Sequence, residues 1–285
     1  MGNKNNQASV GTTQTGIRYN SKLSSAVSNF ASAVYCKPVA NPLKQKYGST
    51  YNQFIAAEKY RLSGNHKKAR EAYRTVIADC PEFLEAYTAL SKLYEALGDY
   101  ESAILWLKKR LGKNQFCYQT QLQLAKCYGQ TTHFQKALRH YKKVLKLTPQ
   151  NLEAAFGVAL THEQLGQIDR AIAMYESITH LVPDFLPAYN NLGTLYIKLG
   201  VYQKAETIFR ALTEKSPNFY RGHLGLAITY DRSGQTRKAI KTYQVLLQKR
   251  PHSINAAYIK DRIGELSFSK TIQARQSKNL MVRVK

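Results

Sequence analysis

The sequence has few acidic residues and no long apolar run, and each shortage excludes a class of protein. Among 285 residues, 18 Asp and Glu stand against 42 Lys and Arg, for a formal net charge of +24. A membrane-spanning helix needs about 18 or more consecutive apolar residues, and the chain has no such run. The N-terminal residues also lack the basic and apolar regions of a secretion signal. These features favour a protein that neither spans a membrane nor follows the secretory route.

Cysteines are scarce and show neither paired spacing nor metal-binding spacing. Cys36, Cys80, Cys117 and Cys127 form no CxxC motif, so we expect free thiols in a reducing compartment. A Cys117–Cys127 disulfide is the alternative. We accordingly expect a cytoplasmic protein, or one in an organelle lumen if residues 1–48 are a targeting peptide.

Catalytic motifs are missing as well. The sequence contains no glycine-rich phosphate loop, no HExxH and no GxSxG. His133 and His140 are spaced to share one helix face, but no third metal ligand accompanies them. We therefore predict a protein that is not an enzyme and that uses no cofactor or metal.

What the sequence does contain is a period of 34 residues, which has to be read before any single motif. Six segments result, and alanine is invariant at their twentieth position. The segments span 50–83, 84–117, 118–151, 152–185, 186–219 and 220–253. Their thirty-second positions are Pro81, Gln115, Pro149, Pro183, Pro217 and Pro251.

Each segment reads as two amphipathic helices joined by a tight turn. Apolar residues at positions 4, 7, 8 and 11 share one stripe of a first helix, and positions 20, 24 and 27 share a stripe of a second. Small residues at positions 8 and 20 allow close backbone approach, and aromatic residues at positions 11 and 24 fill the space beside them. A glycine near position 15 ends the first helix, and the proline ends the second.

The segment AYNNLGTLYIKLGVYQKAETIFRALTEKSP resembles the tetratricopeptide repeat (TPR), and the resemblance extends over residues 50–253. It implies an all-α fold, a right-handed α-solenoid of six helix–turn–helix repeats. Residues 254–266 read as one more helix, whose Lys260, Asp261 and Arg262 suit a solubilising C-terminal cap. The solenoid is thus expected over 49–266.

The second repeat departs most from the pattern. Arg110 occupies the usually apolar position 27, and Gln115 replaces proline. We expect a looser or shifted junction after this repeat.

Basic segments flank the predicted solenoid. Residues 1–48 have six Lys or Arg and no acid, and we expect them to be mostly disordered, with a possible short helix over 23–34. Residues 267–285 form a second basic tail without acid.

The TPR resemblance places the first helix of each repeat along a concave groove. Positions 2, 5, 9 and 12 of these helices mix apolar and charged residues, with six acidic against four basic. An apolar strip flanked by polar groups suits a bound protein or peptide segment. We therefore hypothesise a scaffold or adaptor in the assembly of a multiprotein complex. The predicted groove residues are Phe54, Glu85, Lys92, Leu122, Lys126, Phe156, Leu160, Glu163, Asn190 and Arg221.

Positive charge gathers instead on the second helices. A basic ridge in the third repeat comprises Lys136, Arg139, Lys142, Lys143 and Lys146. One interpretation is a solvated outer face that maintains solubility. The alternative function is binding of RNA or an anionic membrane surface through this ridge and the tails.

Overall fold

The computed structural model describes residues 42–268. The chain divides into two compact units between Asn52 and Gln53, so the described residues fall into the ranges 42–52 and 53–268. Within the first unit, residues 42–52 form the beginning of helix α2, whose backbone leaves helical geometry at Gly48 (φ 47°, ψ −112°). Helix α2 begins at Pro42, inside the N-terminal segment expected over 1–48. The possible helix over 23–34 lies outside the described residues, as does the C-terminal tail from residue 269 onward.

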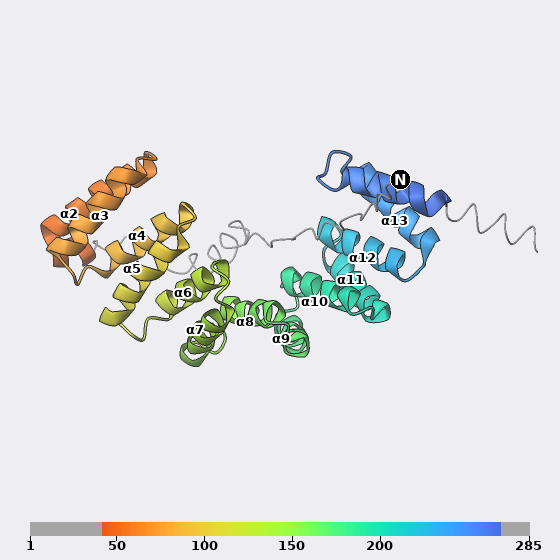
Figure 1. The fold of residues 1–285 in the computed structure, drawn as a ribbon, viewed down its shortest axis with the longest axis horizontal. Coiled ribbons are helices and arrows are strands. Elements are labelled where there is room, and N and C mark those ends of the chain that lie inside the picture. The colour runs from red at the N-terminus through yellow and green to blue at the C-terminus, as the bar shows by residue number, and fades with distance from the viewer. Residues whose placement is uncertain (1–41, 269–285) are drawn as a thin grey trace, which may run out of the picture. The chain divides into compact units, whose positions relative to one another are not determined.

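The described residues are all-α, and the helices alternate with the predicted period (Figure 1). Helices α4, α6, α8, α10 and α12 begin 34 residues apart, the same period as in the sequence. In chain order the helices are α2 (Pro42–Leu62), α3 (His66–Asp79), α4 (Leu84–Ala96), α5 (Tyr100–Lys113), α6 (Tyr118–Gln130), α7 (Phe134–Leu147), α8 (Leu152–Gln164), α9 (Ile168–Leu181), α10 (Leu186–Lys198), α11 (Tyr202–Lys215), α12 (Tyr220–Arg232), α13 (Thr236–Lys249) and a last helix over 256–268.

Two residues after the end of each first helix, the chain passes through the left-handed region. Five of the residues at this point are glycines, with φ between 70° and 77°, and the sixth is Thr132 with φ 59°. The turn is closed by backbone hydrogen bonds, such as that from the Asp99 N–H to the Tyr94 carbonyl at 2.9 Å. A β-branched residue in this region is strained, so the third repeat makes the same turn at a conformational cost.

The core follows the small and large positions of the repeat. Every alanine at position 20 is fully buried, and so are the ring or aliphatic side chains at position 24. From the second repeat to the sixth, the two helices of a repeat contact each other, and each second helix from α3 to α11 contacts the first helix of the next repeat. This is the solenoid architecture that the resemblance implies, in which each repeat is stabilised by its neighbours.

Junctions between repeats depend on one recurrent pair of positions. Residue 6 of a repeat faces residue 24 of the repeat before it. A Cβ added to Gly157 would collide with the Tyr141 ring, and one added to Gly225 would collide with Phe209. At the junction between these two, Asn191 instead donates its amide N–H to the Tyr175 hydroxyl at 3.2 Å.

Of the looser or shifted junction expected after the second repeat, the shift is absent. Helix α6 begins in register, because Arg110 reaches across the junction with its guanidinium. Its Nε donates to the Leu84 carbonyl at 3.3 Å, and Nη1 contacts Cys117 Sγ at 2.9 Å and the Thr120 hydroxyl. Polar contacts thus replace the apolar packing of position 27.

The last helix, over 256–268, packs on the preceding repeat with one face only. Ala256, Ile259 and Leu266 are buried, while Lys260 and Asp261 are exposed. Ile259 and Leu266 join the cluster built around Tyr230 and Tyr243 of the sixth repeat. The helix therefore caps this cluster, as its sequence predicts.

Cys80, Cys117 and Cys127 are free thiols, so the alternative Cys117–Cys127 disulfide is not formed. Cys36 lies outside the described residues.

Candidate partner-binding surface

The first helices of the repeats form a row of their own in the second compact unit. Figure 1 shows α4, α6, α8, α10 and α12 along one side, and the second helices α5, α7, α9, α11 and α13 along the other. Helix α6 contacts α8, and α10 contacts α12, in addition to their contacts with second helices. We use "first-helix stripe" for positions 2, 5, 9 and 12 of these helices, where the groove residues were predicted.

Two phenylalanines of the stripe occupy equivalent places. The Phe54 ring lies 5.9 Å from Tyr73 and 5.1 Å from Phe83, measured between centroids. Phe156 repeats this arrangement with Tyr175 at 5.8 Å and Phe185 at 5.1 Å. Both phenylalanines are half-buried, so one edge serves the core and the other remains accessible.

Aliphatic residues of the stripe divide into accessible and buried ones. Leu160 on α8 and Leu224 and Ile228 on α12 are half-buried. Leu122 on α6 is only 9% exposed, which corrects its assignment as a partner contact. The helical spacing places Leu122 toward the core, where it contributes to packing.

Charged residues of the stripe form ion pairs between neighbouring first helices. Lys126 Nζ on α6 lies 2.5 Å from Glu153 Oε1 on α8. Glu163 Oε1 on α8 accepts from Lys198 Nζ on α10 at 2.8 Å. Predicted residues Lys126 and Glu163 therefore connect repeats to each other as well as lining the surface.

The remaining predicted polar residues are more open. Lys92 and Arg221 are exposed, and Glu85 is half-buried. Asn190 donates from Nδ2 to the Asn191 Oδ1 at 3.3 Å. Of the predicted set, these four leave the most polar surface available.

Tyrosine hydroxyls at position 24 donate hydrogen bonds to carboxylates of the first-helix stripe. Tyr73 donates to Glu58, Tyr175 donates to Glu163 at 3.4 Å, and Tyr243 donates to Asp231 at 3.3 Å. Burial, reinforced by nearby carboxylates, raises the pKa of Tyr73 and of Tyr243 above the ordinary tyrosine value. The Tyr73 and Tyr243 hydroxyls therefore remain protonated, and each donates to a carboxylate at the edge of the stripe.

The second repeat lacks this support because its position 24 is Leu107. Glu95, at position 12, has a buried Oε1 atom without a hydrogen-bond partner in the described part of the chain. Burial raises the pKa of Glu95, while Cys127 and the ammonium groups of Lys126 and Lys92 act in the opposite direction. Burial also raises the pKa of the neighbouring Cys127 thiol, which is 1% exposed. The charged form of Glu95 is thus less well stabilised than the carboxylates that accept a tyrosine hydrogen bond.

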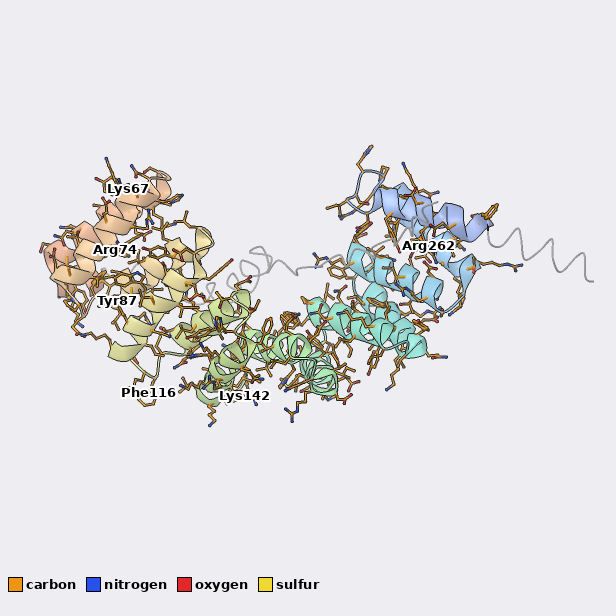
Figure 2. All side chains as sticks on the ribbon, in the orientation of Figure 1. Lys67, Arg74, Tyr87, Phe116, Lys142 and Arg262 are labelled. Atoms are coloured by element: carbon orange, nitrogen blue, oxygen red, sulfur yellow. The ribbon has the colours of Figure 1, made fainter. Side chains whose placement is uncertain are left out.

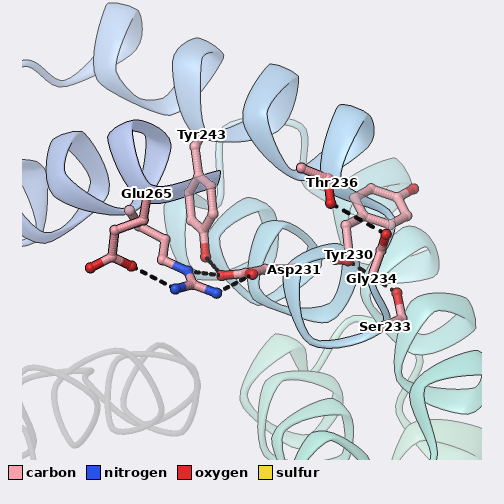
Figure 3. Close-up of polar contacts among 8 residues, drawn as sticks. Tyr230, Asp231, Ser233, Gly234, Thr236, Tyr243 and Glu265 are labelled. Atoms are coloured by element: carbon pink, nitrogen blue, oxygen red, sulfur yellow. Dashed lines mark hydrogen bonds and ion pairs between the residues drawn. The ribbon is translucent and has the colours of Figure 1, made fainter. Parts of the chain in front are cut away.

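At the C-terminal end of the stripe, Arg262 of the last helix forms an ion pair with Asp231 on α12. Its guanidinium bonds both carboxylate oxygens of Asp231 and also Glu265 Oε2 at 2.6 Å, as Figure 3 shows. The same residues, with Arg232 and Tyr258, line a hollow of about 340 Å³. From the sequence, Arg262 was expected to be a polar residue of a solubilising cap, whereas in the structure it pairs with Asp231. The available signal was an acid at position 12 combined with a tyrosine at position 24.

The predicted basic ridge lies on α7, and all five of its residues are exposed. Beneath them, the His140 ring stacks on Tyr128 with 5.4 Å between centroids, and Nδ1 lies 2.7 Å from Gln121 Oε1. Burial, together with the charges of Lys143, Arg139 and Lys108, lowers the pKa of His140 to about 4. His140 is thus neutral near pH 7.

Residues 42–268 show neither a metal-binding cluster nor a membrane-spanning helix. No group of three His, Cys, Asp or Glu side chains in this range could hold a metal ion. None of the described helices combines the length and apolar character needed to cross a membrane.

Comparison with known proteins identifies the repeat. Models described as "Tetratricopeptide repeat" match residues 57–115, 132–196 and 196–263. No curated protein matches the sequence significantly. The structure is similar to the crystal structure of the MamA protein, with 25% identity, coverage of 59% of this chain and 92% of MamA, and a TM-score of 0.55.

Two further solved structures show the same fold. YrrB, described as a TPR protein with an unusual peptide-binding site, is 18% identical, with coverage of 67% of this chain and 99% of YrrB and a TM-score of 0.52. The type IV pilus biogenesis factor PilW is 15% identical, with coverage of 74% and 98% and a TM-score of 0.62. The family models together match more than half of the sequence, and the chain belongs to the tetratricopeptide repeat family.

Proposed function

We propose that this protein is a non-enzymatic scaffold that holds a segment of another protein along the first-helix stripe, in the assembly of a multiprotein complex. TPR folds generally serve protein–protein interaction, and YrrB is described as having a peptide-binding site. The observation that carries the proposal is the set of half-buried apolar residues on α8 and α12. Phe156, Leu160, Leu224 and Ile228 remain accessible although their helices are fully packed on both neighbours.

The chemistry of the stripe indicates the kind of segment it would accept. Apolar side chains of the partner would contact Phe156, Leu160 and Ile228. The ion pairs Lys126–Glu153 and Glu163–Lys198 flank this region and offer both signs of charge. Exposed Arg221 and half-buried Asn190 and Glu85 supply further polar contacts. An amphipathic segment matches such a surface better than a uniformly charged one.

The test is selection of peptides from a random displayed library on the full-length protein. The dissociation constants of the selected peptides are then measured by fluorescence anisotropy. Leu160→Ser and Ile228→Ser should each weaken binding about tenfold or more, because buried apolar anchors supply most of the affinity of such interfaces. The matched control is Leu181→Ser on α9, a second helix, where the leucine is 74% exposed.

Circular dichroism of every variant controls for loss of helix. Peptides that tolerate both stripe substitutions, or that lose affinity with Leu181→Ser instead, would contradict the proposed surface. Failure to select any peptide would contradict it as well.

A further inference from the structure

All five cations on α7, and Lys108 and Lys109 on α5, are exposed without an ion pair to any carboxylate of residues 42–268. The α7 sequence contains no acidic residue, and among residues 42–268 no carboxylate lies within ion-pair distance of its five cations. On α5, Lys108 and Lys109 are likewise exposed and without an ion pair in that range, whereas exposed Lys113 pairs with Glu82. Unneutralised like charges repel one another, which makes an anionic partner favourable.

The cations of the two helices converge on a single ring. Lys108 Nζ on α5 lies 5.9 Å from the Tyr128 centroid, and Lys136 Nζ on α7 lies 5.6 Å from it. His140 stacks on the same ring, and its pKa is lowered by the nearby charges of Lys143, Arg139 and Lys108 as well as by burial. The basic surfaces of neighbouring repeats are therefore continuous. We use "α5–α7 face" for Lys108, Lys109, Lys113, Lys136, Arg139, Lys142, Lys143 and Lys146.

Apolar side chains accompany these cations at high exposure. Leu105 is 51% exposed and lies three and four residues before Lys108 and Lys109, on the same side of α5. Leu147 is 40% exposed and lies four residues after Lys143 on α7. Phe116, in the turn after α5, is 79% exposed. Figure 2 shows Phe116 and Lys142 projecting toward the same side of the second compact unit.

We propose that the α5–α7 face docks on the surface of an anionic phospholipid bilayer. The ammonium and guanidinium groups contact lipid phosphates and carboxylates, and Phe116, Leu105 and Leu147 enter the boundary between headgroups and acyl chains. This binding is separate from the first-helix stripe, so it stands or falls independently of the proposed scaffold function.

The same observations favour lipid over RNA. Single-stranded RNA is usually held by exposed rings that stack on bases. Tyr128 is only 5% exposed, and half-buried Trp106 already has Lys109 Nζ 4.3 Å from its centroid. Two of the three exposed apolar groups are leucines, which offer no ring to a base.

The experiment is flotation of the full-length protein with vesicles of phosphatidylcholine alone or with about a third of phosphatidylserine. One variant replaces Lys136, Arg139, Lys142 and Lys143 with Gln. Its matched control replaces four exposed cations of α13 with Gln and so removes the same charge. These residues are Arg237, Lys238, Lys241 and Lys249. Each cation near an anionic membrane contributes about fivefold to binding, so the α7 variant, which lacks four cations, should bind on the order of several hundredfold more weakly, and the α13 control should lose far less.

Phe116→Ser supplies a second, uncharged test. It should weaken binding to phosphatidylserine vesicles about tenfold, since burial of a phenylalanine side chain contributes that much. Leu181→Ser on α9 is the control and should have no effect. Anisotropy with a single-stranded RNA oligonucleotide forms the competing arm.

Three outcomes would overturn the proposal. One is absence of binding to phosphatidylserine vesicles at low salt. Another is an equal loss in the α7 and α13 variants, which would indicate a general charge effect. The third is RNA binding that depends on α7 while vesicle binding does not. Loss of peptide binding in Leu160→Ser with intact vesicle binding would show that the two surfaces act separately.

Discussion

The guanidinium of Arg262 and the carboxylate of Asp231 form a two-bond pair, with Nε to Oδ2 at 2.7 Å and Nη2 to Oδ1 at 2.8 Å. Asp231 has only 5% of its side chain exposed, so it depends on this partner and on the Tyr243 hydroxyl. The hydrogen bonds to Asp231 and Glu265 raise the pKa of Arg262 above its usual range. The pair joins the last helix to α12 by a polar contact on top of the apolar cluster beneath (Figure 3).

Replacing Arg262 with alanine should loosen the last helix from the sixth repeat. Removal leaves the Asp231 carboxylate buried with one neutral donor, at a cost of about 2 kcal/mol. Hydrogen exchange followed by mass spectrometry should show faster exchange over residues 256–268 and little change in α4 to α9. Glu265→Ala removes only the outer, exposed pair and serves as the control. Unchanged exchange in Arg262→Ala would show that apolar packing alone holds the helix.

Replacing Thr132 with glycine should stabilise the protein. Thr132 has φ 59° where the other five repeats use glycine, and glycine adopts this region without the steric penalty of a β-branched residue. We expect a gain of about 0.5–1 kcal/mol in urea denaturation followed by circular dichroism. Thr131→Gly is the control, because φ there is −89° and its hydroxyl bonds the Cys127 carbonyl, so it should destabilise. A loss of stability in Thr132→Gly would show that its side chain has a compensating role.

Glu95→Gln should stabilise the protein near pH 7. Burial raises the pKa of Glu95 above its ordinary value of 4.5, so the unfolded chain loses this proton at lower pH than the folded chain. Stability contributed by the protonated form therefore falls as pH rises through that range. Urea midpoints measured from pH 4 to pH 8 should decline less in the variant than in the wild type. A variant that is less stable at every pH would mean that the carboxylate makes a contact worth more than its burial costs.

The charges on α7 should control the ionisation of His140. Its pKa is lowered from 6.5 to about 4 by burial and by Lys143, Arg139 and Lys108. Replacing Arg139 and Lys143 with Gln should raise this pKa, as measured by NMR titration of the imidazole. Lys142→Gln is the control, because Lys142 does not contribute to the shift. An unchanged pKa in the double variant would mean that burial alone is responsible.

The same shift predicts a loss of stability in acid. The unfolded chain binds a proton at His140 near pH 6.5, whereas the folded chain binds it only near pH 4. Stability should therefore decline as pH falls between these values, and His140→Gln should reduce that decline. Thermal unfolding at a series of pH values checks this. The prediction fails if both proteins lose stability equally over this interval.

The sequence predicted the helices and their register because the 34-residue period constrains every repeat at once. It did not predict which charges would be neutralised, because those partners lie one repeat away along the chain. Lys126 and Glu153 are adjacent only after α6 and α8 pack, and the same holds for Asp231 and Arg262. Arg110 was misjudged for a related reason. A long side chain can leave an apolar position and reach a backbone carbonyl 26 residues earlier.

The alternation of Gly157, Asn191 and Gly225 at the repeat junctions limits how such a chain can lengthen. A tandem copy of residues 186–219 would bring a second Asn191 against Phe209, where a Cβ on Gly225 would already collide. The copied asparagine would also lose the Tyr175 hydroxyl that receives its amide hydrogen. Growth by gene duplication of this segment would therefore require a compensating substitution at one of the two positions, so neighbouring repeats are expected to evolve as matched pairs.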